Sequence, residues 1–192
     1  TQNPIEQEGT YPLPVAALDR FLFQIRIDYP TPEEERLVVR RTLRPDEEVL
    51  ERILSSEGIA EALSTARAVE MPEPTLALAT RIVRLTRPQL LGTPAFVREH
   101  IRWGASPRGV QTLVLAAKAR AMLHGRSRAG PDDVVAIARP SLRHRLLRTY
   151  HAEAEGVTVD AIIDRVVRLA RGEPEPAAAA PRGWLDRFRR GA

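Results

Sequence analysis

The feature that most constrains the fold is a series of helical segments, each opened by a capping residue, that fills most of the chain. In one of them Thr31 is placed to cap the helix, Pro32 takes the first helical position, and Glu34 follows three residues after the cap. The longest segment, 106–124, carries an apolar stripe and ends at Gly125. Further helices are expected at 47–55, 59–69, 75–87, 94–101, 131–138, 141–151 and 158–169. The pattern predicts a mainly α chain.

One segment departs from the helical period. Apolar and polar residues alternate at 21–28, where Phe21, Phe23, Ile25 and Ile27 are the apolar members. Alternation of this kind predicts a β-strand with one buried face. We therefore expect one or two short strands near the start of the chain, followed by helices alone.

The first fourteen residues, TQNPIEQEGTYPLP, lack any apolar period and are rich in turn-forming proline and glycine. A stretch this polar is not core, so it is predicted to form a loop over a functional site, followed by a short helix at 15–18. Because the chain begins with Thr1 rather than methionine, we expect it to be the C-terminal part of a longer protein. Residues 173–181 have the composition of a linker, and the basic tail at 182–192 is predicted to be frayed or to form a small amphipathic helix.

Three polar residues are candidates for chemistry. Arg108 follows Ser106 and Pro107 and so lies in the first turn of a helix, where a cation is unfavourable unless an anion is brought to it. Pairing with an acid or exposure to water is an equally good explanation from spacing alone. Arg20 could form a salt bridge with Asp19 or Asp28, and Asn3 precedes a proline, which is typical of a turn.

Other chemistry finds little support. The chain has no cysteine, and its four histidines lack metal-ligand spacing, so no metal site is predicted. Ser106 is explained as a helix cap, and Glu6 and Glu8 are expected to be solvated or paired with arginine. No apolar run is long enough to span a membrane. The net charge of +4 and a basic cluster at 139–148 leave one alternative open, a non-enzymatic helical module that binds nucleic acid or an acidic protein.

The segment 1–21, TQNPIEQEGTYPLPVAALDRF, closely resembles the sensor-1 to arginine-finger segment of the MoxR-type AAA+ ATPases. It departs from the usual family pattern at Val15 and Ala17, between the functional positions. The run Gly-Ala-Ser-Pro-Arg at 104–108 is similar to the sensor-2 motif of the same family. The resemblance covers residues 1–172, although a related AAA+ enzyme such as a chelatase subunit stays open.

The resemblance implies a fold and three roles. Residues 1–30 would be the C-terminal end of an α/β AAA+ P-loop core, 31–172 an all-helical lid, and 173–192 a linker and tail. Asn3 would be sensor 1 and position the attacking water. Arg20 would be the arginine finger, and Arg108 would contact the phosphates of ATP, in its own subunit or in a neighbour.

The resemblance also implies a function for the parent protein: hydrolysis of ATP with Mg²⁺ at subunit interfaces, to drive chaperone-like maturation of protein complexes. The expected partners are further copies of the same protein in a ring, usually a hexamer, and a client protein such as one with a von Willebrand factor A domain. The expected compartment is the cytoplasm, and nucleic acid is not expected as a partner. No Gly-x-x-x-x-Gly-Lys-Ser/Thr motif occurs in the sequence, so the chain by itself is not expected to hydrolyse ATP.

Overall fold

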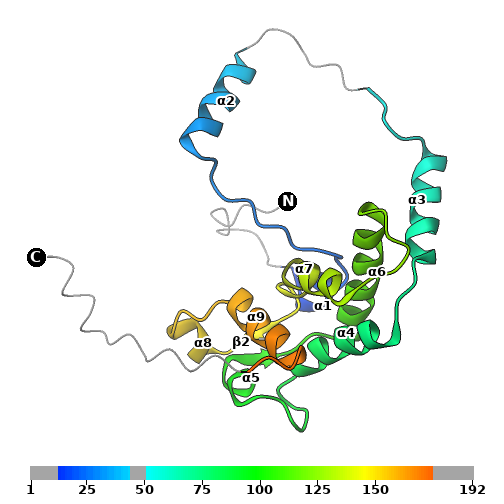
Figure 1. Ribbon diagram of the computed structural model, residues 1–192. Coiled ribbons are helices and arrows are strands. Elements are labelled where there is room, and N and C mark those ends of the chain that lie inside the picture. The colour runs from blue at the N-terminus through cyan, green and yellow to red at the C-terminus, as the bar shows by residue number, and fades with distance from the viewer. Residues whose placement is uncertain (1–12, 44–50, 175–192) are drawn as a thin grey trace, which may run out of the picture.

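A computed structural model of the chain describes residues 13–43 and 51–174 (Figure 1). Their elements, in chain order, are α1 (Val15–Leu18), α2 (Pro32–Thr42), α3 (Ser56–Ala68), α4 (Glu73–Leu85), α5 (Ala95–His100), β1 (Ile101–Trp103), α6 (Pro107–Leu123), α7 (Pro131–Leu142), β2 (Leu147–Arg148), α8 (Tyr150–Ala154) and α9 (Val159–Ala170). The predicted mainly α fold is confirmed.

The core lies between α4, α6, α7 and α9, which pack together as a bundle (Figure 1). The apolar stripe of α9 is buried as predicted, at Ile162, Ile163, Val166 and Val167. Helix α6 presents Leu113 and small residues such as Ala117 and Ala121, all fully buried. Short side chains on α6 allow close approach of α7, which forms the most extensive contact in the bundle.

A buried carboxylate fixes the turn between α6 and α7. Asp133 is only 1% exposed and accepts hydrogen bonds from Arg126 Nη1 at 2.7 Å, Arg120 Nη1 at 2.6 Å and the Gly130 amide at 2.8 Å. The hydrogen bonds from Arg126 are the main reason that the pKa of Asp133 lies well below its usual range. The ionised carboxylate is therefore both paired and hydrogen-bonded, as a buried charge must be.

Two expectations about strands need correction. Residues 21–28 are not a strand, and their apolar side chains are exposed, with Ile25 at 76% and Ile27 at 90%. A strand needs a neighbouring strand for its backbone hydrogen bonds, and none of the described residues supplies one. The helical part is also not all helix, because β1 and β2 pair antiparallel, with Ile101 opposite Arg148.

Two predicted helices are also wrong. The segment 141–151 is divided among the end of α7, the strand β2 and the start of α8. Residues 51–55 are not helical, and the remainder of the helix expected at 47–55 lies outside the described residues. The other helices were predicted to within a few residues. The predicted capping box of α2 is present: the Glu34 amide donates to Thr31 Oγ1 at 3.3 Å, and the Glu34 carboxylate accepts from the Thr31 amide.

Helix α2 lies apart from the bundle, and all of its residues are exposed (Figure 1). Helix α3 contacts α6 and has one buried residue, Ala66. In the part of the chain that the structure describes, no helix combines the length and the apolar character needed to cross a bilayer.

Candidate functional site

A buried arginine, Arg145, binds the loop that follows α1. Its side chain is 2% exposed, and its Nε lies 3.1 Å from Asp19 Oδ1. Its Nη2 donates to the carbonyl oxygens of Asp19 at 3.0 Å and Phe21 at 2.7 Å, and to Thr112 Oγ1 on α6 at 3.1 Å. Burial lowers the pKa of Arg145, and the adjacent Asp19 carboxylate opposes that shift. The guanidinium of Arg145 thus attaches the loop that follows α1 to the helical bundle.

Neighbours of Arg145 extend this attachment along the loop. Arg143 Nη1 donates to the Gln24 carbonyl at 3.3 Å, and the Gln24 amide donates to the Pro140 carbonyl at 2.9 Å. His144 Nε2 lies 3.0 Å from the Phe21 carbonyl, an acceptor, so this nitrogen must carry the proton. Burial lowers the pKa of His144, which favours the neutral ring. The backbone groups that a strand would have paired with its neighbour are therefore bound in part by the helical bundle.

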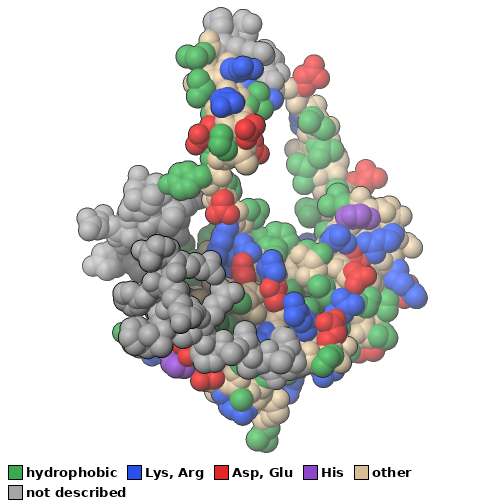
Figure 2. Space-filling view, turned by 60° about the vertical axis from the view of Figure 1, so that its left-hand side comes forward, with side chains coloured by type: hydrophobic (Ala, Val, Ile, Leu, Met, Phe, Trp, Pro, Cys, Tyr) green, Lys and Arg blue, Asp and Glu red, His purple; other side chains and the backbone are tan. Residues whose placement is uncertain are grey.

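These contacts correct the expectation for the basic cluster at 139–148. The cluster left open a surface that binds nucleic acid or an acidic protein, but Arg143 and Arg145 are mostly buried. Each of the four arginines pairs with an acid: Arg139 with Asp164 at 2.6 Å, Arg143 with Asp160 at 3.0 Å, Arg145 with Asp19 at 3.1 Å, and Arg148 with Glu153 at 3.6 Å. On the face of the molecule drawn in Figure 2, basic and acidic side chains are interspersed. Neutralised arginines give no support to nucleic-acid binding, which depends on unpaired positive charge.

Two of the three candidate residues line the same groove. A depression of about 200 Å³ is lined by Asp19, Arg20, Leu22, Arg108, Gln111, Thr112, Leu115 and Arg145. Arg20 is exposed and forms no ion pair with any residue in the described part of the chain. The salt bridge considered from the sequence is therefore not made, because the Asp19 carboxylate is turned to Arg145 and Arg108 instead.

Arg108 also lies at the helix start predicted for it. Ser106 caps α6 by accepting from the Arg108 amide at 3.1 Å, and its hydroxyl donates to Asp19 Oδ2 at 2.8 Å. Arg108 Nη1 is 3.4 Å from the same carboxylate oxygen, and the Arg108 side chain is 55% exposed. This exposed, long contact contributes little stability, so the guanidinium is available to a stronger anion. Asn3 lies outside the described residues, and the structure does not test its role.

The loop before α6 is held against the end of α4. The Ala105 amide donates to Thr86 Oγ1 at 3.0 Å, and Arg87 Nε donates to the Ala105 carbonyl at 2.9 Å. A Cβ on Gly104 would lie only 2.3 Å from the Thr86 carbonyl oxygen and 2.8 Å from Arg87 Cα. Glycine is therefore required here by close approach of two backbone segments, and this approach sets the position of Ser106 and Arg108.

Replacing Gly104 with alanine should lower the free energy of unfolding by about 2–3 kcal/mol, because the methyl group meets backbone atoms that cannot move aside. Gly58→Ala is the matched control. Its added Cβ would lie no closer than 3.6 Å to other atoms, within helix α3, where alanine is favoured over glycine. Urea unfolding of both variants measures the difference. Equal stability of the two variants would contradict the proposed close approach.

Sequence reasoning missed Arg145 and Gly104. Arg145 stands in a run of arginines that carries no periodic signal, and only its burial separates it from its neighbours. Gly104 precedes a helix cap by two residues, where a glycine is ordinarily read as a turn. Composition does not distinguish the buried Arg145 from the exposed Arg139 of the same run.

The comparisons with known proteins agree with this arrangement. Residues 94–166 match the sequence model of the AAA lid domain, and residues 1–23 match that of the ATPase family associated with various cellular activities. A crystal structure of a protein from Cytophaga hutchinsonii, provisionally classed as an ATPase, superposes with a TM-score of 0.80 at 35% identity, covering 87% of this chain and 51% of the other. From α5 into α9, the chain thus matches the lid domain of an AAA+ ATPase.

The relatives define the family within that class. Chaperone MoxR1 of Mycobacterium tuberculosis is 38% identical over 170 residues, covering 88% of this chain and 44% of the relative. Protein MoxR of Paracoccus denitrificans is 34% identical over 193 residues, covering 92% and 55%. The chain belongs to the MoxR family of AAA+ ATPases, and it spans about half the length of these relatives.

Proposed function

We propose that this chain supplies the sensor and lid part of an ATP-driven, chaperone-like MoxR ATPase, with the Mg²⁺-ATP of a neighbouring subunit bound against its groove. Asn3 positions the attacking water, Arg20 is the arginine finger, and Arg108 contacts the phosphates. In this proposal copies of the full-length protein assemble into a ring, usually a hexamer. The ring acts in the cytoplasm on client proteins such as those with a von Willebrand factor A domain.

The observation that carries the proposal is that Arg20 and Arg108 line one groove together with Asp19. A polyanion in this groove would meet two exposed guanidinium groups, whose planar forks match phosphate oxygens. An arginine finger acts by neutralising the charge that develops on the transferred phosphoryl group. Since the finger reaches a nucleotide held by another subunit, a second arginine in the same groove faces that same nucleotide. We therefore assign both arginines to action in trans.

The loop attachment supports this assignment. Asp19 is bound by Arg145 from the lid and by Ser106 at the start of α6. The mostly buried Asp19 carboxylate therefore connects the loop that bears Arg20 to helix α6, which bears Arg108. A movement of the lid would carry both arginines together toward the phosphates or away from them.

Mixed assemblies of the full-length protein test the trans assignment. Arg108→Ala subunits keep an intact phosphate-binding loop, whereas subunits with the lysine of that loop replaced keep Arg108. We expect neither variant alone to hydrolyse ATP and a mixture of the two to recover turnover, because one subunit then offers Arg108 to the other's nucleotide.

If Arg108 acts in its own subunit, no site in the mixture is complete and turnover stays at the level of the separate variants. An exposed arginine in the following loop, Arg26, supplies the control, and Arg26→Ala should be active without mixing. A full-length protein that hydrolyses no ATP in its unmodified form would overturn the proposed function as a whole.

A further inference from the structure

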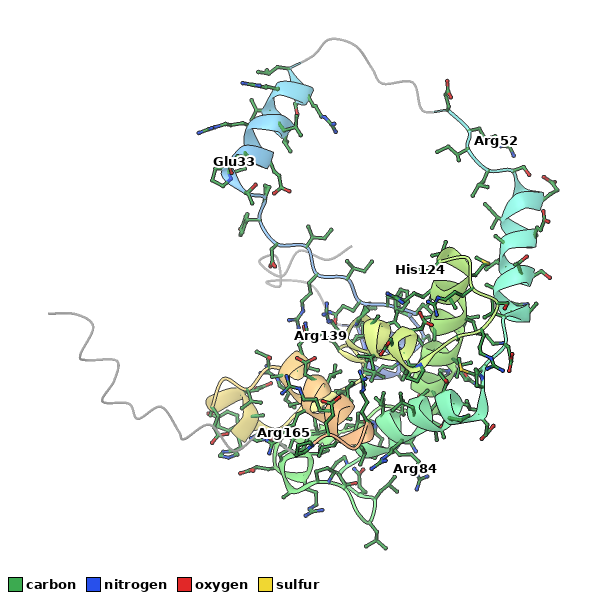
Figure 3. All side chains as sticks on the ribbon, in the orientation of Figure 1. Glu33, Arg52, Arg84, His124, Arg139 and Arg165 are labelled. Atoms are coloured by element: carbon green, nitrogen blue, oxygen red, sulfur yellow. The ribbon has the colours of Figure 1, made fainter. Side chains whose placement is uncertain are left out.

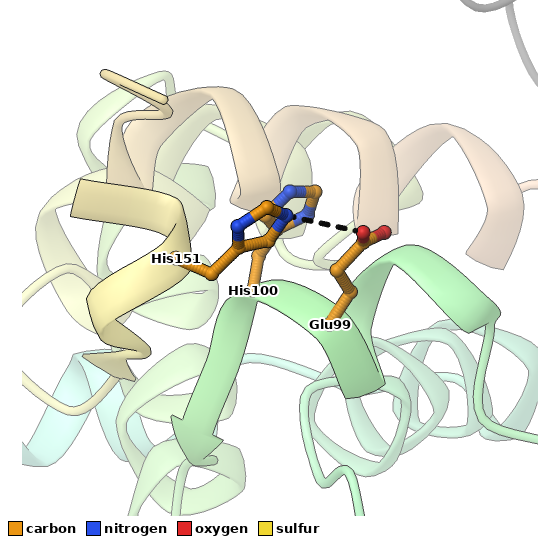
Figure 4. Close-up of side chains that lie close together, drawn as sticks. All are labelled: Glu99, His100 and His151. Atoms are coloured by element: carbon orange, nitrogen blue, oxygen red, sulfur yellow. Dashed lines mark ion pairs between the residues drawn. The ribbon is translucent and has the colours of Figure 1, made fainter. Parts of the chain in front are cut away.

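A cluster of two histidines and two glutamates lies on the side of the lid formed by α5 and α8. Ligand atoms of Glu99, His100 and His151 are all within 4.8 Å of one another. Glu155 joins them, with one carboxylate oxygen 3.1 Å from His100 Nε2 and the other 3.3 Å from His151 Nε2. Figure 4 shows both imidazole rings beside the Glu99 carboxylate. Spacing along the sequence predicted no metal site, but the fold brings ligands together that are some fifty residues apart.

The backbone holds the two halves of the cluster in register. The Thr149 amide donates to the His100 carbonyl at 2.9 Å, and Thr149 Oγ1 donates to the Glu99 carbonyl at 2.8 Å. Thr149 also caps α8, so the start of this helix is fixed to the end of α5. His151 and Glu155 are four residues apart at the two ends of one helical turn, and both therefore face α5.

The distances suit a tetrahedral metal ion. Zn²⁺ binds imidazole nitrogen and carboxylate oxygen at about 2.0–2.1 Å, so neighbouring ligand atoms in a tetrahedron are about 3.3 Å apart. The His151 Nε2 atom is 3.3 Å from Glu99 Oε1 and 3.3 Å from Glu155 Oε1, and the other Glu155 oxygen, Oε2, is 3.1 Å from His100 Nε2. The rings are parallel, with centroids 6.0 Å apart, and both present Nε2 to the Glu155 carboxylate.

We propose that Glu99, His100, His151 and Glu155 form a binding site for Zn²⁺ or a similar divalent transition metal. The two carboxylates balance the charge of the ion, and the imidazole nitrogen ligands favour Zn²⁺ over Mg²⁺ or Ca²⁺. The His100 side chain is 11% exposed, while the other three are about half exposed, so the ion can enter from solvent. The bound metal joins α5 to α8 and stabilises this edge of the lid, which is separate from the groove of Arg20 and Arg108.

The test uses the whole 192-residue chain, freed of metal by a chelator and titrated with zinc chloride in a calorimeter near neutral pH. We expect one ion per chain, a Zn²⁺-dependent rise in the unfolding temperature, and, with Co²⁺ as probe, the visible absorption of a tetrahedral site. His151→Ala should weaken binding roughly 10- to 100-fold or more, since even partners of metal ligands have effects of that size.

His124 provides the control, because it is exposed and lies at the end of α6, away from α5 and α8 (Figure 3). His124→Ala should bind zinc as the unaltered chain does. Glu155→Gln keeps the size of the side chain but removes its charge, and should weaken binding without unfolding the apoprotein. Absence of saturable zinc binding, equal loss in the His124 and His151 variants, or equal affinity in all variants would each overturn the proposal.

Discussion

Replacing Arg20 with alanine in the full-length assembly is expected to lower the turnover number for ATP hydrolysis by about 10³-fold or more, with little change in the dissociation constant for ATP. The guanidinium stabilises charge that is larger in the transition state than in bound ATP, so its loss affects turnover more than binding. Arg20 is exposed in the groove and forms no ion pair among the described residues, so its removal leaves no buried partner behind. Steady-state hydrolysis and a fluorescent-nucleotide titration measure the two quantities.

Two further substitutions separate a specific role from a general effect of charge. Arg26→Ala removes an exposed arginine six positions later in the same loop and should leave turnover nearly unchanged. Arg20→Lys retains the positive charge but not the planar fork, so we expect it to restore only a small part of the activity. Full turnover in Arg20→Ala assemblies would remove the finger assignment, whatever the Arg26 control does.

Replacing Arg145 with leucine is expected to reduce the free energy of unfolding by about 3–5 kcal/mol, the range for breaking a buried ion pair by removing one partner. The Asp19 carboxylate, 14% exposed, would lose its closest cation. The carbonyl oxygens of Asp19, Leu22 and Ser141 would lose the Arg145 donor, and the Phe21 carbonyl would keep only His144; an unsatisfied buried acceptor is itself costly. Urea unfolding of the whole chain, followed by circular dichroism, measures the change.

Arg139→Leu is the matched control for this experiment. Arg139 forms a shorter pair with Asp164, at 2.6 Å against 3.1 Å for Arg145 and Asp19, but its side chain is 55% exposed. An exposed pair contributes about 1 kcal/mol or less, because water solvates the separated charges. A destabilisation by Arg145→Leu no larger than that of Arg139→Leu would show that the attachment of the loop to the lid contributes little to the fold.

The two predictions are connected through Asp19. The carboxylate next to the proposed finger is bound by the lid, so the position of Arg20 depends on a residue more than a hundred positions later in the chain. We expect Arg145→Leu in the full-length protein to lower turnover as well, at a temperature where the variant is still folded. The physical reason is that a loosened finger spends less time in the geometry that stabilises the transition state.

The helices and their caps could be predicted because the signals are local. Thr31 and Ser106 cap helices within three residues of themselves, and the apolar stripe of α9 repeats within its own length. Arg108 at the start of α6 follows from the same local rules. The segment 21–28 was predicted wrongly for the opposite reason. Alternating apolar residues define a face, but the hydrogen bonds of a strand come from another segment.

The sequence by itself determined a mainly helical chain, the starts of its helices and the family to which it belongs, because each of these depends on residues that are close together in the sequence. Only the tertiary structure decided which arginines are buried. It also decided that Gly104 must lie against the end of α4, and that His100 and His151 meet. Burial and proximity arise from the packing of distant segments, and two arginines with the same composition around them differ only in what the folded chain places beside them.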